Sequence, residues 1–486
     1  MNRAVSVLLL LALFALLAPP LPAAAAGQSV LRALLVGVDR FVSQPDTQPA
    51  ARNNIINLSQ AFGQDDRGYQ SMRVSLNEPQ NYESFKRLVE DSFFGADGDD
   101  VSLLYITTHG LYQLSDEPMR FAMLLSNGES EFRLTAEALY EITHAIPGMK
   151  ILIIDTCNAG ALIDRGLQGD GTRSLFHRDE YKIITSSGGS EPSFFWSTGN
   201  GSYHGGSYFA DTLVLGVSPQ GNYAADANRD GTITLDELYR YLLQNYGVST
   251  PQVYPLDDST PVLTYDRRVT AADPALITNL TLDQAAFSLK DAELEFSYTL
   301  NRAALVHYQL IYQNNDAWDF SNAQVIKESD DRPGRKSRSL RIDYKAADTS
   351  GYALLFLVTS EGENATPHAQ TLLAAEPAEG DPALGAVPLR GSFSPLRGEE
   401  LPFYISHAFP LRLSARVLDS GGRTVRVLAG DTPTRPGHLP DGGWLLYWSG
   451  RTQSGSFASP GAYSLEVSAY IGEKRCLVSS APFILQ

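Results

Sequence analysis

Short apolar runs alternate with amphipathic segments between residue 31 and about residue 266, and this rhythm limits what that part of the chain can form. Four runs are almost continuously apolar, as strands buried on both faces of a sheet are: Leu31–Val38, Val101–Thr107, Lys150–Asp155 and Tyr181–Thr185. Three segments between them have apolar residues at helical spacing: Asn53–Phe62, Tyr82–Phe93 and Thr135–Ile146. The pattern predicts an α/β domain at 27–266, with a mostly parallel sheet and helices on both faces.

After Arg268 the pattern changes to period-two alternation without long helical segments. Four segments show this alternation: Asp291–Leu300, Leu305–Tyr312, Ser337–Tyr344 and Gly351–Thr359. A linker rich in Ala, Pro, Glu and Gly, Ala374–Ala386, precedes a last stretch of short strands with turn signals. The sequence therefore predicts two all-β, immunoglobulin-like sandwiches, at 268–375 and 385–486.

The first 26 residues have the features of a secretory signal peptide. Arg3 provides a positive start, Val5–Leu17 is apolar, and Ala24–Ala26 provides small residues for cleavage. The apolar run is short for a membrane span, and no later segment has the ~20 apolar residues that a membrane helix needs. We expect an exported protein without a transmembrane helix in its mature chain, located outside the cell, in a periplasm or on the cell surface.

Composition narrows the classes of partner and cofactor. The formal net charge is −17, from 38 basic and 55 acidic side chains, so nucleic acid is a poor candidate partner. Cys157 and Cys476 are the two cysteines, too few for a disulfide framework or a four-thiolate metal site. We expect no organic cofactor.

Reactive residues follow two of the predicted strands. His109 and Gly110 come after Val101–Thr107, and Cys157 comes after Lys150–Asp155. Parallel strands place their carboxyl ends at one edge of the sheet, so His109 and Cys157 are expected to face each other. An imidazole beside a thiol lowers the thiol pKa and can protonate a leaving amine. The N–H groups of Gly110 and Cys157 are candidates for an oxyanion hole.

At these residues the chain resembles the caspase-like cysteine peptidases, which include metacaspases, legumains and the clostripain and gingipain groups. His109 and Cys157 are 48 residues apart, and caspases separate the pair by about 50 residues. The segment Asp155–Gly160 fits the metacaspase and legumain form, acidic-x-Cys-x-x-Gly, and departs from the caspase form. The resemblance covers about half of the chain and implies a catalytic dyad of His109 and Cys157 that acts on protein or peptide substrates.

The resemblance also implies a specificity. The family residue two before the Cys lines the primary pocket, and Asp155 at that position implies preference for Arg or Lys before the scissile bond. Ser186, Ser187 and Glu191 follow the next strand and are implied as further polar pocket residues. Metacaspases have a second acid in an early Asn-Asp pair, where this chain has Asn53-Asn54.

Residues 226–237 fit the twelve-residue EF-hand calcium loop position by position. Gly231 would make the turn, and Leu235–Tyr246 has the pattern of the exiting helix. The approach to the loop does not look helical, so the site is expected to be a single, structural Ca²⁺ site. Thr234 is at position nine of the loop. The predicted ligands are Asp226, Asn228, Asp230, Thr232 through its carbonyl, and Glu237 in bidentate fashion.

The last stretch resembles the immunoglobulin-like module of flagellar hook-capping proteins, which often closes bacterial exported chains. Three segments carry the resemblance: Val417–Leu428, Trp444–Thr452 and Pro460–Val467. It implies presentation or cell-surface attachment.

Two functions remain open at this point. The first is an exported cysteine endopeptidase that cleaves after Arg or Lys and also cuts its own segment Asp164–Glu180, after Arg165, Arg173 or Arg178 and most plausibly after Arg173. The second is a surface adhesin or scaffold with an inactive, or only self-processing, caspase-like domain. The intact pair of His109 and Cys157 favours the peptidase.

Overall fold

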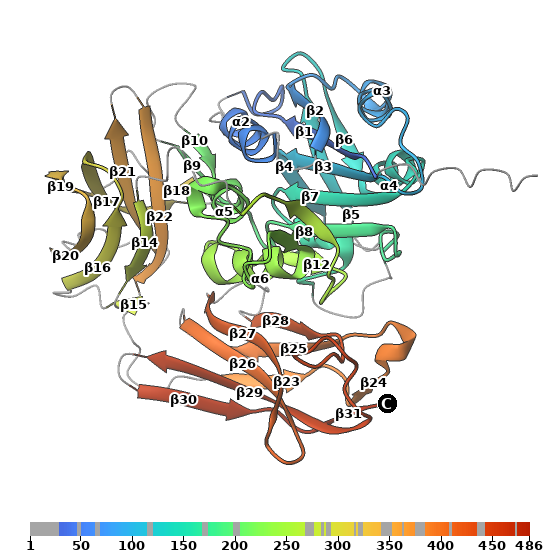
Figure 1. Cartoon of the computed structure of the whole chain (residues 1–486), viewed down its shortest axis with the longest axis vertical. Helices are drawn as coiled ribbons and strands as arrows, with labels where there is room; N and C mark the ends of the chain where they lie inside the picture. The colour runs from blue at the N-terminus through green and yellow to red at the C-terminus, as the bar shows by residue number, and fades with distance from the viewer. Residues whose placement is uncertain are drawn as a thin grey trace, which may run out of the picture.

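The computed structural model of the chain describes most of residues 29–486 (Figure 1). The predicted signal peptide and residues 375–383 of the predicted linker lie outside the described residues. The described ranges are 29–45, 50–63, 69–113, 120–167, 174–197, 205–267, 277–282, 286–287, 293–314, 317–318, 324–341, 352–361, 364–374, 384–407, 411–434, 443–471 and 474–486.

A six-stranded, mostly parallel sheet organises residues 29–267, which we call the α/β region. Its strand order is β12-β8-β7-β3-β1-β2, and only the edge strand β12 runs antiparallel to its neighbour. The four strands predicted from apolar runs are all present and central. The bounds are β1 Leu31–Gly37, β2 Tyr69–Leu76, β3 Val101–Thr107, β7 Met149–Asp155, β8 Tyr181–Thr185 and β12 Gln252–Tyr254.

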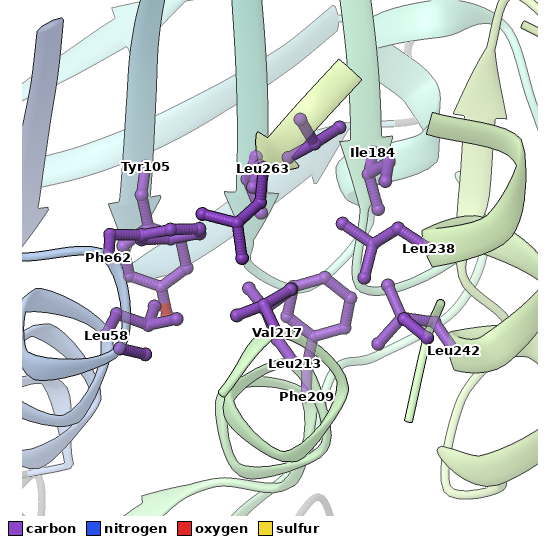
Figure 2. Close-up of a cluster of buried hydrophobic side chains, with 14 of the residues drawn as sticks. Leu58, Phe62, Tyr105, Ile184, Phe209, Leu213, Val217, Leu238, Leu242 and Leu263 are labelled. Atoms are coloured by element: carbon purple, nitrogen blue, oxygen red, sulfur yellow. The ribbon is translucent and has the colours of Figure 1, made fainter. Parts of the chain in front are cut away.

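Helices cover both faces of this sheet, as predicted. One face packs on α2 (Ala51–Phe62), α5 (Tyr208–Val217) and α6 (Leu235–Asn245), and Figure 2 shows the apolar side chains buried there. The other face packs on α3 (Tyr82–Ser92) and α4 (Ala136–His144). Because adjacent strand residues point to opposite faces, continuously apolar strands such as β1 supply both cores.

Several further strands in the α/β region were not predicted. Most of them have no continuous apolar run, although Phe121–Leu125 is such a run and was missed. The edge strands β2 and β12 are two of these further strands. The others form a three-stranded antiparallel sheet directly after β3 and two pairs of short antiparallel strands, β9 with β10 and β11 with β13. Their bounds are β4 His109–Gln113, β5 Arg120–Ser126, β6 Glu131–Thr135, β9 Phe195–Ser197, β10 Gly205–Ser207, β11 Thr232–Thr234 and β13 Pro261–Thr264; the 3₁₀ helices are η1 Ala159–Ile163 and η2 Pro219–Gly221.

The middle β region, within residues 277–374, consists of strands alone in its described part, as predicted. One sheet has the order β14-β16-β20, and the other has β15-β22-β21-β17-β18 with β19 beside β17. All pairs are antiparallel except β15 with β22. The bounds are β14 Ile277–Leu282, β15 Ala286–Phe287, β16 Glu293–Leu300, β17 Ala304–Asn314, β18 Ala317–Trp318, β19 Gln324–Asp331, β20 Gly334–Arg341, β21 Tyr352–Glu361 and β22 Asn364–Ala374.

The C-terminal β region, residues 384–486, has two further sheets that share one apolar core. Trp448 of the first sheet packs against Tyr463 and Phe483 of the second, with ring centroids 5.3 and 5.9 Å apart. The sheets are antiparallel apart from the short pair β24–β31. The bounds are β23 Gly385–Pro388, β24 Ser392–Phe393, η3 Pro395–Arg397, β25 Leu401–Ser406, β26 Leu411–Asp419, β27 Thr424–Thr434, β28 Gly443–Trp448, β29 Gly461–Ile471, β30 Lys474–Ser479 and β31 Phe483–Leu485. The immunoglobulin-like identity of the two β regions remains a prediction.

Candidate active site

Strands β3 and β7 are adjacent and in parallel register, so Thr107 is opposite Asp155 at the carboxyl edge of the sheet. The chain leaves β3 towards His109 and leaves β7 towards Cys157, which brings the two reactive side chains to one cavity. This cavity has a volume of about 510 Å³ and is lined by His109, Gly110, Asp155 and Cys157, among others. These residues therefore lie together at one edge of the sheet, as the sequence predicts.

Gly110 marks the tightest approach between the two sides of the cavity. A Cβ atom at this position would lie 1.8 Å from the carbonyl oxygen of Cys157 and 2.9 Å from Oγ1 of Thr156. Only a residue without a side chain permits this packing. The backbone after His109 thus lies directly against the backbone of the residue that carries the thiol.

His109 is half-buried, and its ring lies 4.5 Å from the ring of Phe41, measured between centroids. Burial lowers the pKa of His109 below its ordinary value, because the charged imidazolium loses hydration in this environment. The neutral ring, which can accept a proton, is the form favoured at neutral pH.

Cys157 is half-buried, and its thiol donates a hydrogen bond to the carbonyl oxygen of Ser193 at 3.5 Å. The following residue, Asn158, has a left-handed backbone with φ of 59°. The chain therefore turns sharply after the thiol and enters the 3₁₀ helix η1. The amide side chain of Asn158 donates to the carbonyl of Gly189 at 3.0 Å, which ties the turn to the segment after β8.

Asp155 lies at the end of β7, 3% exposed, and lines the cavity. Its carboxylate accepts hydrogen bonds from the hydroxyls of Tyr105 at 3.0 Å and Ser193 at 3.2 Å. Burial raises the pKa of Asp155, although hydrogen bonds from Ser207, Tyr105, Ser186 and Ser193 oppose part of that rise. The residue is a desolvated acid in the same cavity as the thiol.

Ser186 and Ser187 are buried and are not among the residues that line the cavity. Both hydroxyls donate to the carbonyl of Thr156, at 3.3 and 2.9 Å, and Ser187 also accepts from the N–H of Ala159. They support the loop that carries Cys157 from behind. Glu191 is also buried, and its Oε2 accepts from the N–H of Gly188 at 3.1 Å.

The cavity contains residues that sequence reasoning missed. Asp39 lies 8% exposed, and one of its oxygens accepts from the side chain of Asn77 at 2.8 Å. Asp39 follows β1, so the rule that polar residues gather after parallel strands could have found it. Other lining residues are Phe41, Gln44, Pro192, Ser193, Phe194, Phe195 and Ser207.

The Asn53-Asn54 pair lies at the start of α2. Asn54 is buried and lines the cavity, where it donates to Thr107 Oγ1 at 3.0 Å and accepts from the N–H of Ser207 at 2.8 Å. Asn53 donates to the carbonyl of Gly205 instead. The place expected for a second acid is thus occupied by a neutral amide.

Asp155 and Asp39 are acidic, and no Lys or Arg occurs among the described residues that line the cavity.

The predicted calcium loop has the expected turn. Gly231 has φ of 92°, and the carboxylate of Asp226 accepts from the N–H groups of Asp230 and Gly231 at 3.3 and 2.9 Å. Glu237 caps α6 by accepting from the N–H and the hydroxyl of Thr234. The oxygen donors suit Ca²⁺ chemically. However, no three His, Cys, Asp or Glu side chains anywhere among the described residues lie close enough together to hold a metal ion.

The arginines of the predicted self-cleavage segment have different surroundings. Arg173 lies outside the described residues. Arg178 is exposed and donates to the carbonyl of Leu175 at 3.3 Å. Arg165 is 4% exposed and forms an ion pair with Glu400. The inclusion of Arg165 among the candidate cleavage sites is therefore wrong, because a buried, paired arginine cannot enter a protease cleft.

No family model and no curated protein matches the chain. Solved structures are similar over about half of it, including the following three. A structural-genomics protein from Geobacter sulfurreducens has a TM-score of 0.35 and 13% identity, over 50% of this chain and 99% of its own. Caspase-1 from Spodoptera frugiperda has a TM-score of 0.30 and 16% identity, over 49% of this chain and 89% of its own. Dimeric latent PorU from Porphyromonas gingivalis has a TM-score of 0.19 and 12% identity, over 46% of this chain and 22% of its own. Similarities this low assign no family.

No helix in the described part of the chain is long and apolar enough to cross a bilayer.

Proposed function

We propose that this protein is an exported cysteine endopeptidase of the caspase-like type, with His109 and Cys157 as its catalytic dyad. One observation carries the proposal: His109, Gly110 and Cys157 line a single cavity, where Gly110 packs directly against the backbone of Cys157. A lone thiol or a lone imidazole at a strand end has structural explanations, whereas a thiol and an imidazole in one solvent-accessible cavity form a nucleophile and its base.

The reaction proceeds by acyl transfer. His109 takes the proton from Cys157, and the sulfur attacks the carbonyl carbon of the scissile bond. The N–H groups of Gly110 and Cys157 stabilise the resulting oxyanion. The C–N bond then breaks, His109 passes its proton to the leaving amine, and a thioester remains on Cys157. Water, deprotonated by His109, hydrolyses the thioester and restores the thiol.

The charges around the cavity support a preference for Arg or Lys before the scissile bond. Asp155 and Asp39 are carboxylates without a lysine or arginine among the described lining residues. A desolvated carboxylate attracts a cation strongly and repels an anion. We assign Asp155 to the primary pocket. Ser186 and Ser187 act behind the pocket, because both hydroxyls donate to the carbonyl of Thr156 and so support the Cys157 loop.

Three further parts of the proposal come from the sequence. Residues 1–26 would direct export, and self-cleavage would occur after Arg173 or Arg178. A role of the β regions in cell-surface attachment belongs to the same proposal. The adhesin or scaffold alternative is less well supported, because an inactive protein has no need for both His109 and Cys157 beside an open cavity.

A panel of fluorogenic peptides that differ only in the residue before the scissile bond tests the proposal. We expect hydrolysis of the Arg and Lys peptides, slower hydrolysis of the Asp peptide, and no hydrolysis by Cys157→Ala. Wild-type protein that cleaves none of the peptides, or Cys157→Ala protein that retains activity, would refute the proposed dyad. N-terminal sequencing of purified fragments locates any self-cleavage.

A further inference from the structure

The C-terminal β region contacts the loop that carries Cys157. Figure 1 shows this region beneath α6 and the central sheet. The contact is made by Arg165, which follows η1 on the same loop as Cys157 and is 4% exposed. Its guanidinium is paired with Glu400, just before β25, and lies 4.1 Å from the ring centroid of Tyr447 on β28.

Tyr447 makes a second contact with the same loop. Its hydroxyl oxygen accepts a hydrogen bond from the N–H of Gly166 at 3.0 Å. Gly166 has φ of 66°, and a Cβ atom there would lie 2.7 Å from Cα of Gly188. The loop is thus packed between the segment after β8 on one side and the C-terminal sheet on the other.

Backbone hydrogen bonds connect Arg165 to the thiol-bearing turn. The N–H of Arg165 donates to the carbonyl of Gly160 at 2.8 Å, and its carbonyl accepts from Gly189 at 2.8 Å. Gly160 donates to Ser187 at 2.9 Å, and Asn158, adjacent to the nucleophile, donates to Glu191 at 2.8 Å. A displacement of Arg165 would therefore move the backbone that positions Cys157.

A separate group of contacts also holds the C-terminal β region but does not touch this loop. Asp257 accepts hydrogen bonds from Arg426 and Ser449 of the C-terminal region and from Arg240 of α6, the last at 3.0 Å. Leu243 of α6 is buried within the core of the C-terminal region. These contacts provide a matched comparison for Arg165.

We propose that the C-terminal β region supports the candidate active site from outside the cavity, and that Arg165, held by Glu400 and Tyr447, is a positioning residue for Cys157. This inference rests on the proposed function, because Arg165 can affect catalysis only if Cys157 is the nucleophile. A buried arginine without its partner is costly, so the ion pair keeps Arg165 in one place. The C-terminal β region of the same chain thus provides the surface on which the Cys157 loop packs. That surface presents the carboxylate of Glu400 beside the ring of Tyr447.

The test uses the full-length protein with Cys476→Ser, which leaves Cys157 as its one thiol. Arg165→Met removes the charge, and Tyr447→Phe removes one hydroxyl with little change in volume. We expect kcat to fall by about 10- to 100-fold in Arg165→Met, the range for a misplaced catalytic group, with little change in KM. We expect the rate of Cys157 alkylation by iodoacetamide to change as well. Tyr447→Phe should show smaller changes, and Arg165→Lys should restore part of the lost kcat.

Arg426→Met is the matched control, because it removes a buried arginine from the other group of contacts. Its melting temperature should fall as in Arg165→Met, while kcat and the alkylation rate stay unchanged below that temperature. Equal losses of kcat in both variants, or unchanged alkylation in Arg165→Met and Tyr447→Phe, would overturn the inference. If the wild type has no peptidase activity but Arg165→Met still alters alkylation, the proposed function fails and the positioning role stands.

Discussion

Gly110 is the residue at which the two sides of the candidate active site touch. A Cβ atom there would lie 1.8 Å from the carbonyl oxygen of Cys157, so Gly110→Ala must displace backbone. We expect the free energy of unfolding to fall by about 1–3 kcal/mol, as overpacking does elsewhere, and peptidase activity to be largely lost. Thermal denaturation and the initial rate with an Arg peptide measure the two effects.

Gly98→Ala is the control for this substitution, because nothing lies within 4 Å of a Cβ atom at Gly98. Its unfolding free energy should stay within about 1 kcal/mol of the wild type, and its activity should be unchanged. Similar behaviour of the two variants would contradict the close approach at Gly110.

Asp155 connects specificity to the pH dependence of stability. Burial raises its pKa, so the folded protein binds this proton more readily than the unfolded chain does. Its contribution to stability is therefore present at acidic pH and is lost as the pH rises through the raised pKa. Asp155→Asn should be more stable than the wild type at neutral pH but not in acid, and should lose the preference for Arg peptides. Melting curves over a pH series and the peptide panel measure both effects. Lower stability of Asp155→Asn than of the wild type at neutral pH would contradict the claim that burial of the Asp155 carboxylate destabilises the folded protein.

At the scale of elements, Glu237 has two possible functions in one loop. It caps α6 through Thr234, and it is the predicted bidentate Ca²⁺ ligand. Glu237→Gln keeps a cap acceptor but removes the charge that calcium requires. We expect calcium to raise the melting temperature of the wild type by linkage and to leave that of Glu237→Gln unchanged. Identical wild-type melting curves in calcium and in chelator would show that the loop does not bind calcium.

At the scale of the whole molecule, the formal charge of −17 makes the surface attractive to cationic peptides. Raising the ionic strength from about 0.01 to 0.15 M shortens the screening length from about 30 to 8 Å. The kcat/KM for an Arg peptide should therefore fall with added salt. A matched peptide with an uncharged residue before the scissile bond should show little change, and equal salt effects on both would argue against electrostatic attraction.

The amino-acid sequence determined the centre of the α/β region by itself. Each central strand is an almost continuously apolar run, which is typical of a strand buried on both faces, and the helical segments between these runs indicate parallel strands joined by crossovers. Because His109 and Cys157 directly follow two such strands, their placement at one edge also followed from the sequence. The edge strands β2 and β12 did not. Only one of the eight residues of β2 is buried and β12 has only three residues, so each pairs because a central strand is already there.

Tertiary structure alone decided which polar residues surround the thiol. Ser193 and Ser207 come from segments far from Cys157 in the chain, and no local pattern links them to it. The same holds for Arg165, which appeared to be an exposed cleavage site in a polar segment. Its partner Glu400 lies 235 residues away, and a contact at that separation is created by the packing of the C-terminal sheets against the α/β region, which local sequence does not encode.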